Sequence, residues 1–566
     1  MSEFDRNSHS GPMTGGEQVY RALSEAGIDL IVGLPGTQTL PIDRVVAERD
    51  DVRYVVARHE TAIPHVAWGY YEACGTPAAT LTVPGPGDTN AMHGLKNAYE
   101  DCVPIVHVSA DVDPAERGKG PIHEIEPDTY DNVVKENITV DRPRDLGAAV
   151  ERGIELAVTP PYGPVRLGIP SGFLEADVES PGATYEPART RYDNDPAYDE
   201  AIDLLCGADR PLLYAGGGVR RSSSGVEGLR DLAALLNAPV AASLKGKGTV
   251  PEDEARFLGV AGSGCPADVR QVLEDADVVL AVGTDFDGVA TDGWSFPMGD
   301  ALIHVNVDPA DVGRSYEPTV TILDDAGNAC DELATALQNR NVDRGWDGEC
   351  VARSARRAYE SHLDEQGLLE ESSPVSTPAL LRALREVIPR EATVTTDIGG
   401  FRLWTTQVFE TYDSEGFVTG GSWAGMGIGL PAALGAKLAR PERPVVALVG
   451  DGGLMMNLQE CHTAAEYDLD LTVVVSNNSD YGVISKSPKI RAYGNGRRFA
   501  WTSPSFSTIA EGFGWESHEA ASVAEARRHV EAAVDNGEPT LIDVAVDPDE
   551  LTAAAAGDYA PADDLP

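Results

Sequence analysis

Short apolar stretches that end in glycine, proline or aspartate turns recur along almost the whole chain, and helical patterns fill the intervals between them. Examples from the three thirds of the sequence are "ATLTVPGPG", "DVVLAVGTD" and "VVALVGDGG". Strands that alternate with helices are typical of α/β proteins, because parallel strands need a crossover connection that is usually a helix. The alternation therefore predicts an α/β fold built from doubly wound parallel sheets.

The length of the chain predicts more than one such sheet. A sequence of 566 residues exceeds the roughly 100–200 residues of a typical domain, so three domains are expected. Two polar stretches separate the three groups of apolar runs. We place the domains at residues 14–178, 195–338 and 375–548, followed by an acidic tail over 549–566.

The net charge of the chain limits its partners. The formal charge is −47 at neutral pH, which argues against binding to nucleic acid or to anionic membranes, because both are negative. The acidic residues are spread along the whole chain, which favours a halophilic protein, since molar salt shortens the Debye length to about 3 Å and screens the repulsion. An ordinary acidic protein is the alternative interpretation.

The cysteines and the apolar runs predict a cytoplasmic protein. The seven cysteines are scattered and form no C-x-x-C pair, which fits reduced thiols and gives no zinc-site spacing. No apolar run reaches the roughly 18 residues of a membrane span, and the polar start lacks the apolar segment of a signal peptide. We therefore expect neither a membrane nor a nucleic acid as a partner.

The stretch from Gly450 to Asn478 places polar side chains at two neighbouring strand ends. "VVALVG" predicts a buried strand, "LMMNLQECHTAAEYD" an amphipathic helix and "LTVVVSNN" the next strand. The carboxyl ends of parallel strands meet at one edge of a sheet, where open α/β sheets bind ligands. Asp451 and Asn478 are therefore expected to lie close together at this edge.

These side chains suit a magnesium ion. One carboxylate, one amide oxygen and the main-chain carbonyl of Asp480 form an all-oxygen set, which Mg²⁺ completes with waters and phosphate oxygens. The glycines after Asp451 allow close approach of the backbone, and the helix N-terminus that follows can face a phosphate. No Lys-Ser/Thr pair follows them, so the stretch is not a P-loop. From these residues alone, two ordinary strand-end turns remain an equal alternative.

A resemblance covers nearly the whole chain. GDG followed at this spacing by NN is similar to the signature of thiamine diphosphate enzymes of the acetolactate synthase and pyruvate decarboxylase group. "GSWAGMGIGLPAALGAKLA" (421–439), "ARHETAIPHVAWGY" (57–70) and "VPGPGDTNAMHGLKNAYEDCVPIVHVSAD" (83–111) resemble further segments of that family. The chain looks most like the large, catalytic subunit of acetolactate synthase.

The resemblance implies a site as well as a fold. The three domains would be a pyrimidine-binding, a central and a diphosphate-binding domain. Asp451, Asn478 and the Asp480 carbonyl would ligate the Mg²⁺ that holds the cofactor's diphosphate, and Met426 would be the apolar wedge that bends the cofactor. The resemblance further implies contacts to the cofactor from Glu60, Gly450, Gly452, Gly453, Asn477 and Gly482.

Glu60 in "RHETA" occupies the position of the family's catalytic glutamate. A carboxyl group that hydrogen-bonds to the pyrimidine ring of thiamine diphosphate promotes loss of the proton from its reactive carbon, and burial raises the pKa of such a group. The alternative, on the residues alone, is a surface glutamate at a helix start, where acids are favoured. The resemblance favours the catalytic role.

The chain departs from acetolactate synthases where their substrate is bound. The family's "FQE" stretch corresponds here to "GPIHEIE", so that Ile122 and His123 replace phenylalanine and glutamine. An imidazole still donates a hydrogen bond to a carboxylate or a carbonyl, and we expect His123 to act on the substrate. Lys135 in "VVKEN" takes the place of a family lysine and is also assigned to the catalytic set.

A second departure concerns FAD, which acetolactate synthases carry on the central domain. Asp285 in "GTDFDG" stands where the family has an arginine, and an acid repels a pyrophosphate. Arg221 replaces the third glycine of a G-x-G-x-x-G pattern in "AGGGVRRSSSG". FAD is therefore left open and is not expected.

The resemblance predicts an enzyme, a transferase or lyase, that decarboxylates a 2-keto acid and joins the product to a second carbonyl. The first alternative is a simple decarboxylase of the benzoylformate type. The second is a cofactor-binding protein without turnover, against which Glu60 counts. A homodimer or homotetramer is expected, with a small regulatory subunit as a further candidate partner.

Overall fold

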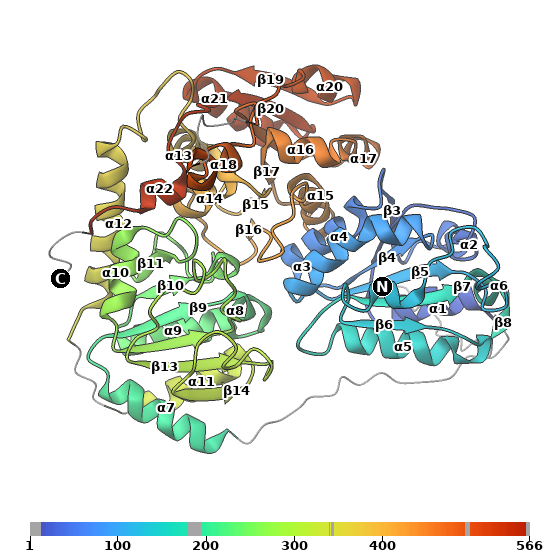
Figure 1. Ribbon diagram of the computed structural model, residues 1–566, viewed down its shortest axis with the longest axis horizontal. Helices are drawn as coiled ribbons and strands as arrows, with labels where there is room; N and C mark the ends of the chain where they lie inside the picture. The colour runs from blue at the N-terminus through green and yellow to red at the C-terminus, as the bar shows by residue number, and fades with distance from the viewer. Residues whose placement is uncertain (1–12, 179–193, 339, 341–344, 493–498, 562–566) are drawn as a thin grey trace, which may run out of the picture. The chain divides into compact units, whose positions relative to one another are not determined.

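The computed structural model describes residues 13–178, 194–338, 340, 345–492 and 499–561. These residues form three six-stranded parallel sheets flanked by helices (Figure 1), which confirms the predicted α/β class. By the density of internal contacts the chain divides into two compact units, residues 1–71 with 76–189 and residues 72–75 with 190–566. The middle and third sheets share the second unit, and the proposed domain boundaries stay a prediction.

The first sheet has the strand order β3-β2-β4-β5-β7-β6. Its strands are β2 (Leu30–Gly33), β3 (Arg53–Val56), β4 (Ala78–Thr82), β5 (Ile105–Asp111), β6 (Glu136–Thr139) and β7 (Val165–Pro170). A short antiparallel pair joins β1 (Met13–Thr14) to β8 (Asp177–Val178). Numbered within the sheet, the order is 2-1-3-4-6-5, so the strand order reverses between β2 and β4.

Helices cover both faces of this sheet. The helices are α1 (Gly15–Glu25), α2 (Leu40–Ala47), α3 (Ala62–Cys74), α4 (Pro86–Glu100), α5 (Leu146–Ala157) and α6 (Ser171–Glu175). Figure 1 shows α1 and α5 along one face and α3 and α4 along the other. Val19 of α1, Val45 of α2 and Val150 of α5 pack into one apolar core with the strands, and removal of this surface from water stabilises the layer.

The middle sheet has a different order, β11-β10-β9-β12-β13-β14. Its strands are β9 (Pro211–Ala215), β10 (Val240–Ala242), β11 (Phe257–Val260), β12 (Val278–Val282), β13 (Ala301–Asn306) and β14 (Val320–Leu323). Its helices are α7 (Asp195–Gly207), α8 (Gly217–Arg221), α9 (Gly225–Leu236), α10 (Ala267–Asp275), α11 (Ala326–Leu337) and α12 (Gly348–Glu365). Numbered within the sheet, this is 3-2-1-4-5-6, the order of dinucleotide-binding folds.

The third sheet repeats the order of the first, as β16-β15-β17-β18-β20-β19. Its strands are β15 (Thr393–Thr396), β16 (Phe417–Val418), β17 (Val445–Gly450), β18 (Thr472–Asn477), β19 (Glu516–Ala520) and β20 (Thr540–Ala545). Its main helices are α13 (Thr377–Val387), α14 (Gly400–Val408), α15 (Gly429–Ala439), α16 (Asp451–Asn457), α17 (Glu460–Glu466) and α21 (Val523–Asn536). The reversal here lies between β15 and β17.

The shorter helices of this domain are α18 (Gly482–Ser485), α19 (Pro488–Ala492), α20 (Phe506–Gly512) and α22 (Ala553–Gly557). Helix α22 lies within the segment predicted to be an acidic tail, and Ala553 and Ala556 are buried in the core of the third domain. The ring of Tyr559 stacks on that of His362 with centroids 4.0 Å apart. Part of the segment proposed as an acidic tail therefore packs on the protein through apolar and aromatic contacts, and its last residues, 562–566, lie outside the described part.

Within the described residues, no helix combines the length and the hydropathy that crossing a membrane requires.

Candidate active site

Two buried aspartates leave neighbouring strands where the order of the third sheet reverses. Asp397 follows β15 and Asp451 follows β17. Loops at the carboxyl ends of strands diverge at such a point and leave a crevice in which α/β proteins bind ligands. The topology thus brings two carboxyl groups to the expected binding position.

Asp451 has a carboxylate oxygen without a partner. Its side chain is 3% exposed in this chain, and Oδ1 accepts a hydrogen bond from the main-chain N–H of Gly452 at 3.0 Å. Oδ2 is buried and has no hydrogen-bond partner among the described residues. Burial raises the pKa of Asp451 to about 6, although the main-chain N–H groups of Gly452 and, to a lesser extent, Ser479 oppose the rise. A buried carboxylate oxygen of this kind is stable only with a cation or a proton beside it.

Asn478 and Asp480 lie in the turn after the next strand, β18. Oδ1 of Asn478 accepts the main-chain N–H of Asp480 at 3.0 Å, which fixes the turn. The carboxylate of Asp480 accepts a hydrogen bond from the Ser485 hydroxyl at 2.7 Å. Asp480 is therefore held through its side chain, and the metal-binding role of its main-chain carbonyl stays a prediction.

Close packing explains two of the glycines after Asp451. A Cβ on Gly452 would lie 2.8 Å from the ring of Tyr481, and a Cβ on Gly453 would lie 2.7 Å from the carboxyl carbon of Asp397. Glycine at 452 therefore lets the Asp451 turn approach the turn that carries Asn478 and Asp480. A Cβ on Gly450 would meet nothing within 4 Å, so its predicted role has no steric explanation here.

Asp397 holds the loop that carries Met426. Its carboxylate accepts main-chain N–H groups from Ile398 at 2.7 Å, Gly427 at 2.9 Å and Gly429 at 3.0 Å. Burial raises the pKa of Asp397, and these donors oppose the rise. Sequence reasoning missed this residue; its signal was an aspartate directly after the strand "TVTT".

In the first domain, Glu60 meets the start of helix α4. Its Oε2 accepts a hydrogen bond from Nδ2 of Asn90 at 3.1 Å, and a Cβ on Gly87 would lie 3.7 Å from Oε1. Glu60 is half-buried within this chain. The start of α4 thus sets the position of the carboxyl group that follows β3.

His123 reaches the same carboxyl edge from the loop after β5. Its Nδ1 lies 3.2 Å from Nε2 of Gln38, which follows β2. A Cβ on Gly85 would lie 2.6 Å from the carbonyl oxygen of His123, so the two backbones touch directly. The structure therefore brings His123 to the N-terminus of α4, the helix whose Asn90 contacts Glu60.

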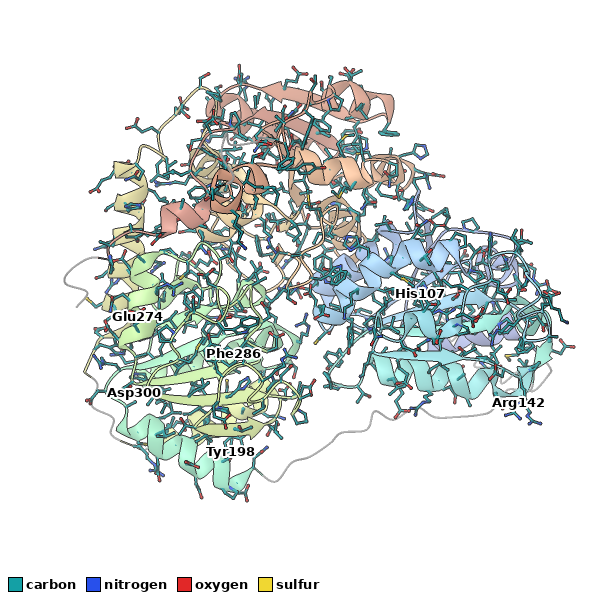
Figure 2. All side chains as sticks on the ribbon, viewed as in Figure 1. His107, Arg142, Tyr198, Glu274, Phe286 and Asp300 are labelled. Atoms are coloured by element: carbon teal, nitrogen blue, oxygen red, sulfur yellow. The ribbon has the colours of Figure 1, made fainter. Side chains whose placement is uncertain are left out.

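A buried charge network supports this edge and was missed by sequence reasoning. Nε of Arg166 lies 2.9 Å from Oδ2 of Asp88, and His107 Nε2 lies 3.1 Å from Oδ1 of Asp88 (Figure 2 labels His107). Burial alone would raise the pKa of Asp88, but Arg166 and His107 outweigh it and hold the pKa below its ordinary value. The ring of Tyr130 packs 4.1 Å from the guanidinium. No local motif pairs Asp88 with an arginine so distant in the sequence.

Comparison with known proteins identifies the family. The central domain model of thiamine pyrophosphate enzymes matches residues 198–333, the N-terminal TPP binding domain model residues 13–131, and the C-terminal TPP binding domain model residues 397–544. An acetolactate synthase large subunit of Parasynechococcus marenigrum is 30% identical over 94% of this chain and 88% of its own length. The chain belongs to the thiamine pyrophosphate enzyme family.

Two further relatives agree over the full length. A probable acetolactate synthase large subunit of Methanocaldococcus jannaschii is 29% identical over 95% of this chain and 93% of its own. The acetolactate synthase isozyme 1 large subunit of Escherichia coli K12 is 29% identical over 97% of each chain. The predicted resemblance is confirmed, and the chain is an enzyme that depends on thiamine diphosphate.

The third domain fits the diphosphate and its metal. The unpaired Oδ2 of Asp451, the Asn478 turn and the close-packed glycines offer an all-oxygen donor set beside a helix N-terminus. The described residues contain no group of three or more His, Cys, Asp or Glu side chains that could hold a metal alone. Such a site is completed by oxygens from the ligand itself, as thiamine diphosphate provides.

Two residues of the predicted cofactor-binding set, Asn477 and Gly482, make close contacts within the third domain. Nδ2 of Asn477 donates to Oδ1 of Asp543 at 3.0 Å, and its Oδ1 accepts from the Ser503 hydroxyl at 3.0 Å, so its side chain ties β18 to β20. A Cβ on Gly482 would lie 3.0 Å from Nδ2 of Asn478. These contacts support indirect roles for Asn477 and Gly482, in which they shape the turn around Asn478.

Lys135 lies apart from the other two predicted catalytic residues, Glu60 and His123. It precedes β6, so it lies at the amino edge of the first sheet, opposite the carboxyl edge that carries Glu60 and His123. Its Nζ donates to the carbonyls of Leu156 at 2.6 Å and Thr159 at 2.7 Å, at the end of α5. The catalytic role predicted for Lys135 gains no support from this placement, and cations at a helix C-terminus commonly stabilise the fold.

Proposed function

We propose that this enzyme decarboxylates a 2-keto acid and joins the product to a second carbonyl compound, with thiamine diphosphate and Mg²⁺. The observation that carries the proposal is the buried, unpaired carboxylate oxygen of Asp451 at the strand reversal. The acetolactate synthase names of the full-length relatives support the carboligation step.

The residues with proposed roles in binding and catalysis lie in two domains. Asp451, Asn478 and the Asp480 carbonyl would hold Mg²⁺, and Met426 would support the cofactor's rings. The bound cofactor supplies a nucleophilic carbon and an electron sink for the loss of CO₂. Glu60, oriented by Asn90, would hold a proton for the pyrimidine ring, and His123 would donate a hydrogen bond to an oxygen of the substrate.

A simple decarboxylase of the benzoylformate type is the second candidate. It is favoured by His123, which replaces the glutamine of acetolactate synthases at the substrate position. A screen of 2-keto acids with thiamine diphosphate and Mg²⁺ in molar salt, with CO₂ and carbon products measured separately, decides between the two. Release of CO₂ with an aldehyde as the sole organic product would reject carboligation.

We further propose a homodimer in which one subunit supplies Glu60 and the other Asp451. The third domain exposes apolar side chains around its site, which favours a protein partner; they are Trp423, Met455, Met456, Tyr481, Val483, Ile484 and Phe499. Because the relatives are named large subunits, a small regulatory subunit is a further partner to test by co-purification.

Complementation tests the shared site. Glu60→Ala and Asp451→Ala are each expected to be inactive, and a mixed dimer has one site with both lesions and one site with neither. With random mixing, half the dimers are mixed, so about a quarter of wild-type activity returns. Activity that stays at the mutant level, with subunit exchange shown by tagged chains, would exclude the shared site.

We propose that the enzyme works without FAD, for two reasons that lie in the middle domain. The main-chain N–H groups of Gly216 and Gly218, which a pyrophosphate would need, donate to Val282 and Gly283 at 2.8 Å each. Burial first, and then the nearby charges of Asp287 and Asp311, raise the pKa of Asp285 to about 7. Whether neutral or ionised, this carboxyl group cannot pair with a pyrophosphate as an arginine would. A stoichiometric flavin absorption band that survives gel filtration would overturn this proposal.

The charge of −47 supports a halophilic, cytoplasmic enzyme. We expect the melting temperature to fall as salt is lowered from molar concentration to about 0.1 M, where the Debye length grows to about 10 Å and repulsion is less screened. An unchanged melting temperature across this range would contradict the high-salt interpretation.

A further inference from the structure

Two loops of the first domain meet through a single pair of side chains. Gln38 lies in the loop after β2 and His123 in the loop after β5, and Nε2 of the glutamine is 3.2 Å from Nδ1 of the imidazole. Both side chains are half-buried. The position of His123 is the one at which the sequence departs from acetolactate synthases, so its chemical state bears on the substrate.

The contact determines where the imidazole carries its proton. In the assigned orientation of the Gln38 amide, its nitrogen faces Nδ1 of His123. An amide nitrogen only donates, so with this orientation Nδ1 accepts and carries no hydrogen. A neutral imidazole then carries its hydrogen on Nε2. That atom makes no hydrogen bond to another residue of the described chain, which leaves an N–H donor for a ligand.

The amide and the imidazole are both held by rigid backbone. Thr39, next to Gln38, is fully buried, accepts the N–H of Gly36 at 2.8 Å and donates to Asp43 at 2.7 Å. His123 has a left-handed backbone with φ of 66°, a conformation that is unfavourable for residues with a Cβ and is found at functional sites. A Cβ on Gly85 would lie 2.6 Å from the carbonyl oxygen of His123, so the main chain at Gly85 packs directly against this residue.

We propose that Gln38 is a positioning residue that selects the Nε2–H tautomer of His123. In this form His123 presents a neutral donor to the carbonyl or carboxylate oxygen of the 2-keto acid. The inference rests on the proposed function for the identity of the substrate. It explains how an imidazole replaces the amide N–H of the glutamine that acetolactate synthases use at this position.

Nitrogen NMR of the full-length protein with thiamine diphosphate and Mg²⁺ tests the tautomer directly. Protein labelled with ¹⁵N-histidine is compared with His123→Gln, which identifies the His123 signals. We expect protonated Nε2 and unprotonated Nδ1 in the wild type. In Gln38→Glu a carboxylate replaces the donor, so Nδ1 is expected to become protonated. Protonated Nδ1 in the wild type, or an unchanged pattern in Gln38→Glu, would overturn the proposal.

Kinetics test whether the tautomer matters for turnover. Gln38→Leu is expected to lower kcat/KM for the 2-keto acid by about 2- to 10-fold, the effect of one weakened hydrogen bond. In a His123→Gln background the same substitution is expected to have no effect, because no tautomer is left to select. Equal losses in both backgrounds would show a merely structural role.

A matched control is Gln271→Ala, which removes an amide that bonds to Asp275 on α10 of the middle domain. Its kcat/KM is expected to match the wild type, and melting temperatures of all variants check folding. The NMR result does not depend on turnover. A tautomer that responds to Gln38 in a protein without activity on any 2-keto acid would reject the proposed function and leave the selection by Gln38 intact.

Discussion

The first and third domains share one strand order, yet the buried aspartates that follow the corresponding strand in each have opposite electrostatic surroundings. Asp88 and Asp451 each follow the third strand of their sheet, β4 and β17. Asp88 is paired with Arg166 and bonded to His107. Asp451 has an oxygen with no partner in the described chain. The same topology thus yields one internally neutralised carboxylate and one that requires an external cation.

The comparison distinguishes a buried carboxylate that stabilises the fold from a buried carboxylate that is a candidate for binding a ligand. A buried carboxylate with its cation inside the fold has its pKa lowered, as for Asp88, and contributes to stability. A buried carboxylate without one has its pKa raised, as for Asp451, and is a candidate for binding. Topology alone predicts the place of a site, and the charges around it determine its use.

The largest effect is expected from breaking the internal pair. Arg166→Met leaves Asp88 buried without its cation, and we expect the free energy of unfolding to fall by about 3–5 kcal/mol. Denaturant unfolding in molar salt measures this. Arg152→Met is the control, because that arginine is 61% exposed in a 3.9 Å ion pair with Glu136 and should cost at most about 1 kcal/mol. Equal losses in the two variants would show that the buried pair of Arg166 and Asp88 stabilises the fold no more than an exposed ion pair does.

The next effect concerns the external cation. Asp451→Asn removes the side-chain charge on the proposed metal, and we expect thiamine diphosphate affinity at ordinary Mg²⁺ to fall more than about 100-fold. Mutation of a residue that only hydrogen-bonds to a metal ligand already lowers metal affinity by about 10–100-fold. Calorimetric titration provides the measurement. Asp468→Asn, at an exposed position after α17, should bind as the wild type does. Unchanged affinity in Asp451→Asn would refute the metal assignment.

In the absence of metal, the same substitution, Asp451→Asn, should stabilise the protein. The folded pKa of Asp451 is about 6, raised from 3.8 by burial, so its contribution to stability is present below about pH 4 and lost as the pH rises through 6. In chelator-treated protein, Asp451→Asn is therefore expected to be more stable than the wild type by about 1–2 kcal/mol at pH 8 and equal at pH 4. Lower stability at pH 8 would mean that an internal partner already neutralises Asp451.

The smallest expected effect concerns the hydrogen bond that Asn90 donates to Glu60 in the first domain. Asn90→Ala removes the donor to Glu60, and we expect kcat to fall by about 2- to 10-fold with thiamine diphosphate affinity nearly unchanged. Steady-state kinetics and calorimetry separate the two quantities. Thr89→Ala, one residue earlier on α4 with a hydroxyl bonded to the Pro86 carbonyl, is the control. A loss of affinity alone would assign Asn90 to binding.

Much of the third domain's site was predictable because its parts are local. Asp451 and Asn478 follow consecutive parallel strands, so their sequence positions place them at one edge. Asp397 precedes them by more than one crossover, and its contacts with Gly427 and Gly429 depend on how the loop after β16 folds back. Spacing along the chain could not predict that return.

The sequence by itself determined the α/β class, the family and the carboxyl edges of two sheets, with Glu60 at the edge of the first sheet and Asp451 and Asn478 at the edge of the third. It could do so because the alternation of strands and helices sets the direction of every parallel strand. Only the tertiary structure decided which charges are neutralised. It placed Arg166 against Asp88 and left Oδ2 of Asp451 without a hydrogen-bond partner among the described residues. It also put Lys135 at the amino edge of the first sheet, away from Glu60. Pairing between distant residues depends on which strands become neighbours, and a carboxylate's pKa follows from that neighbourhood.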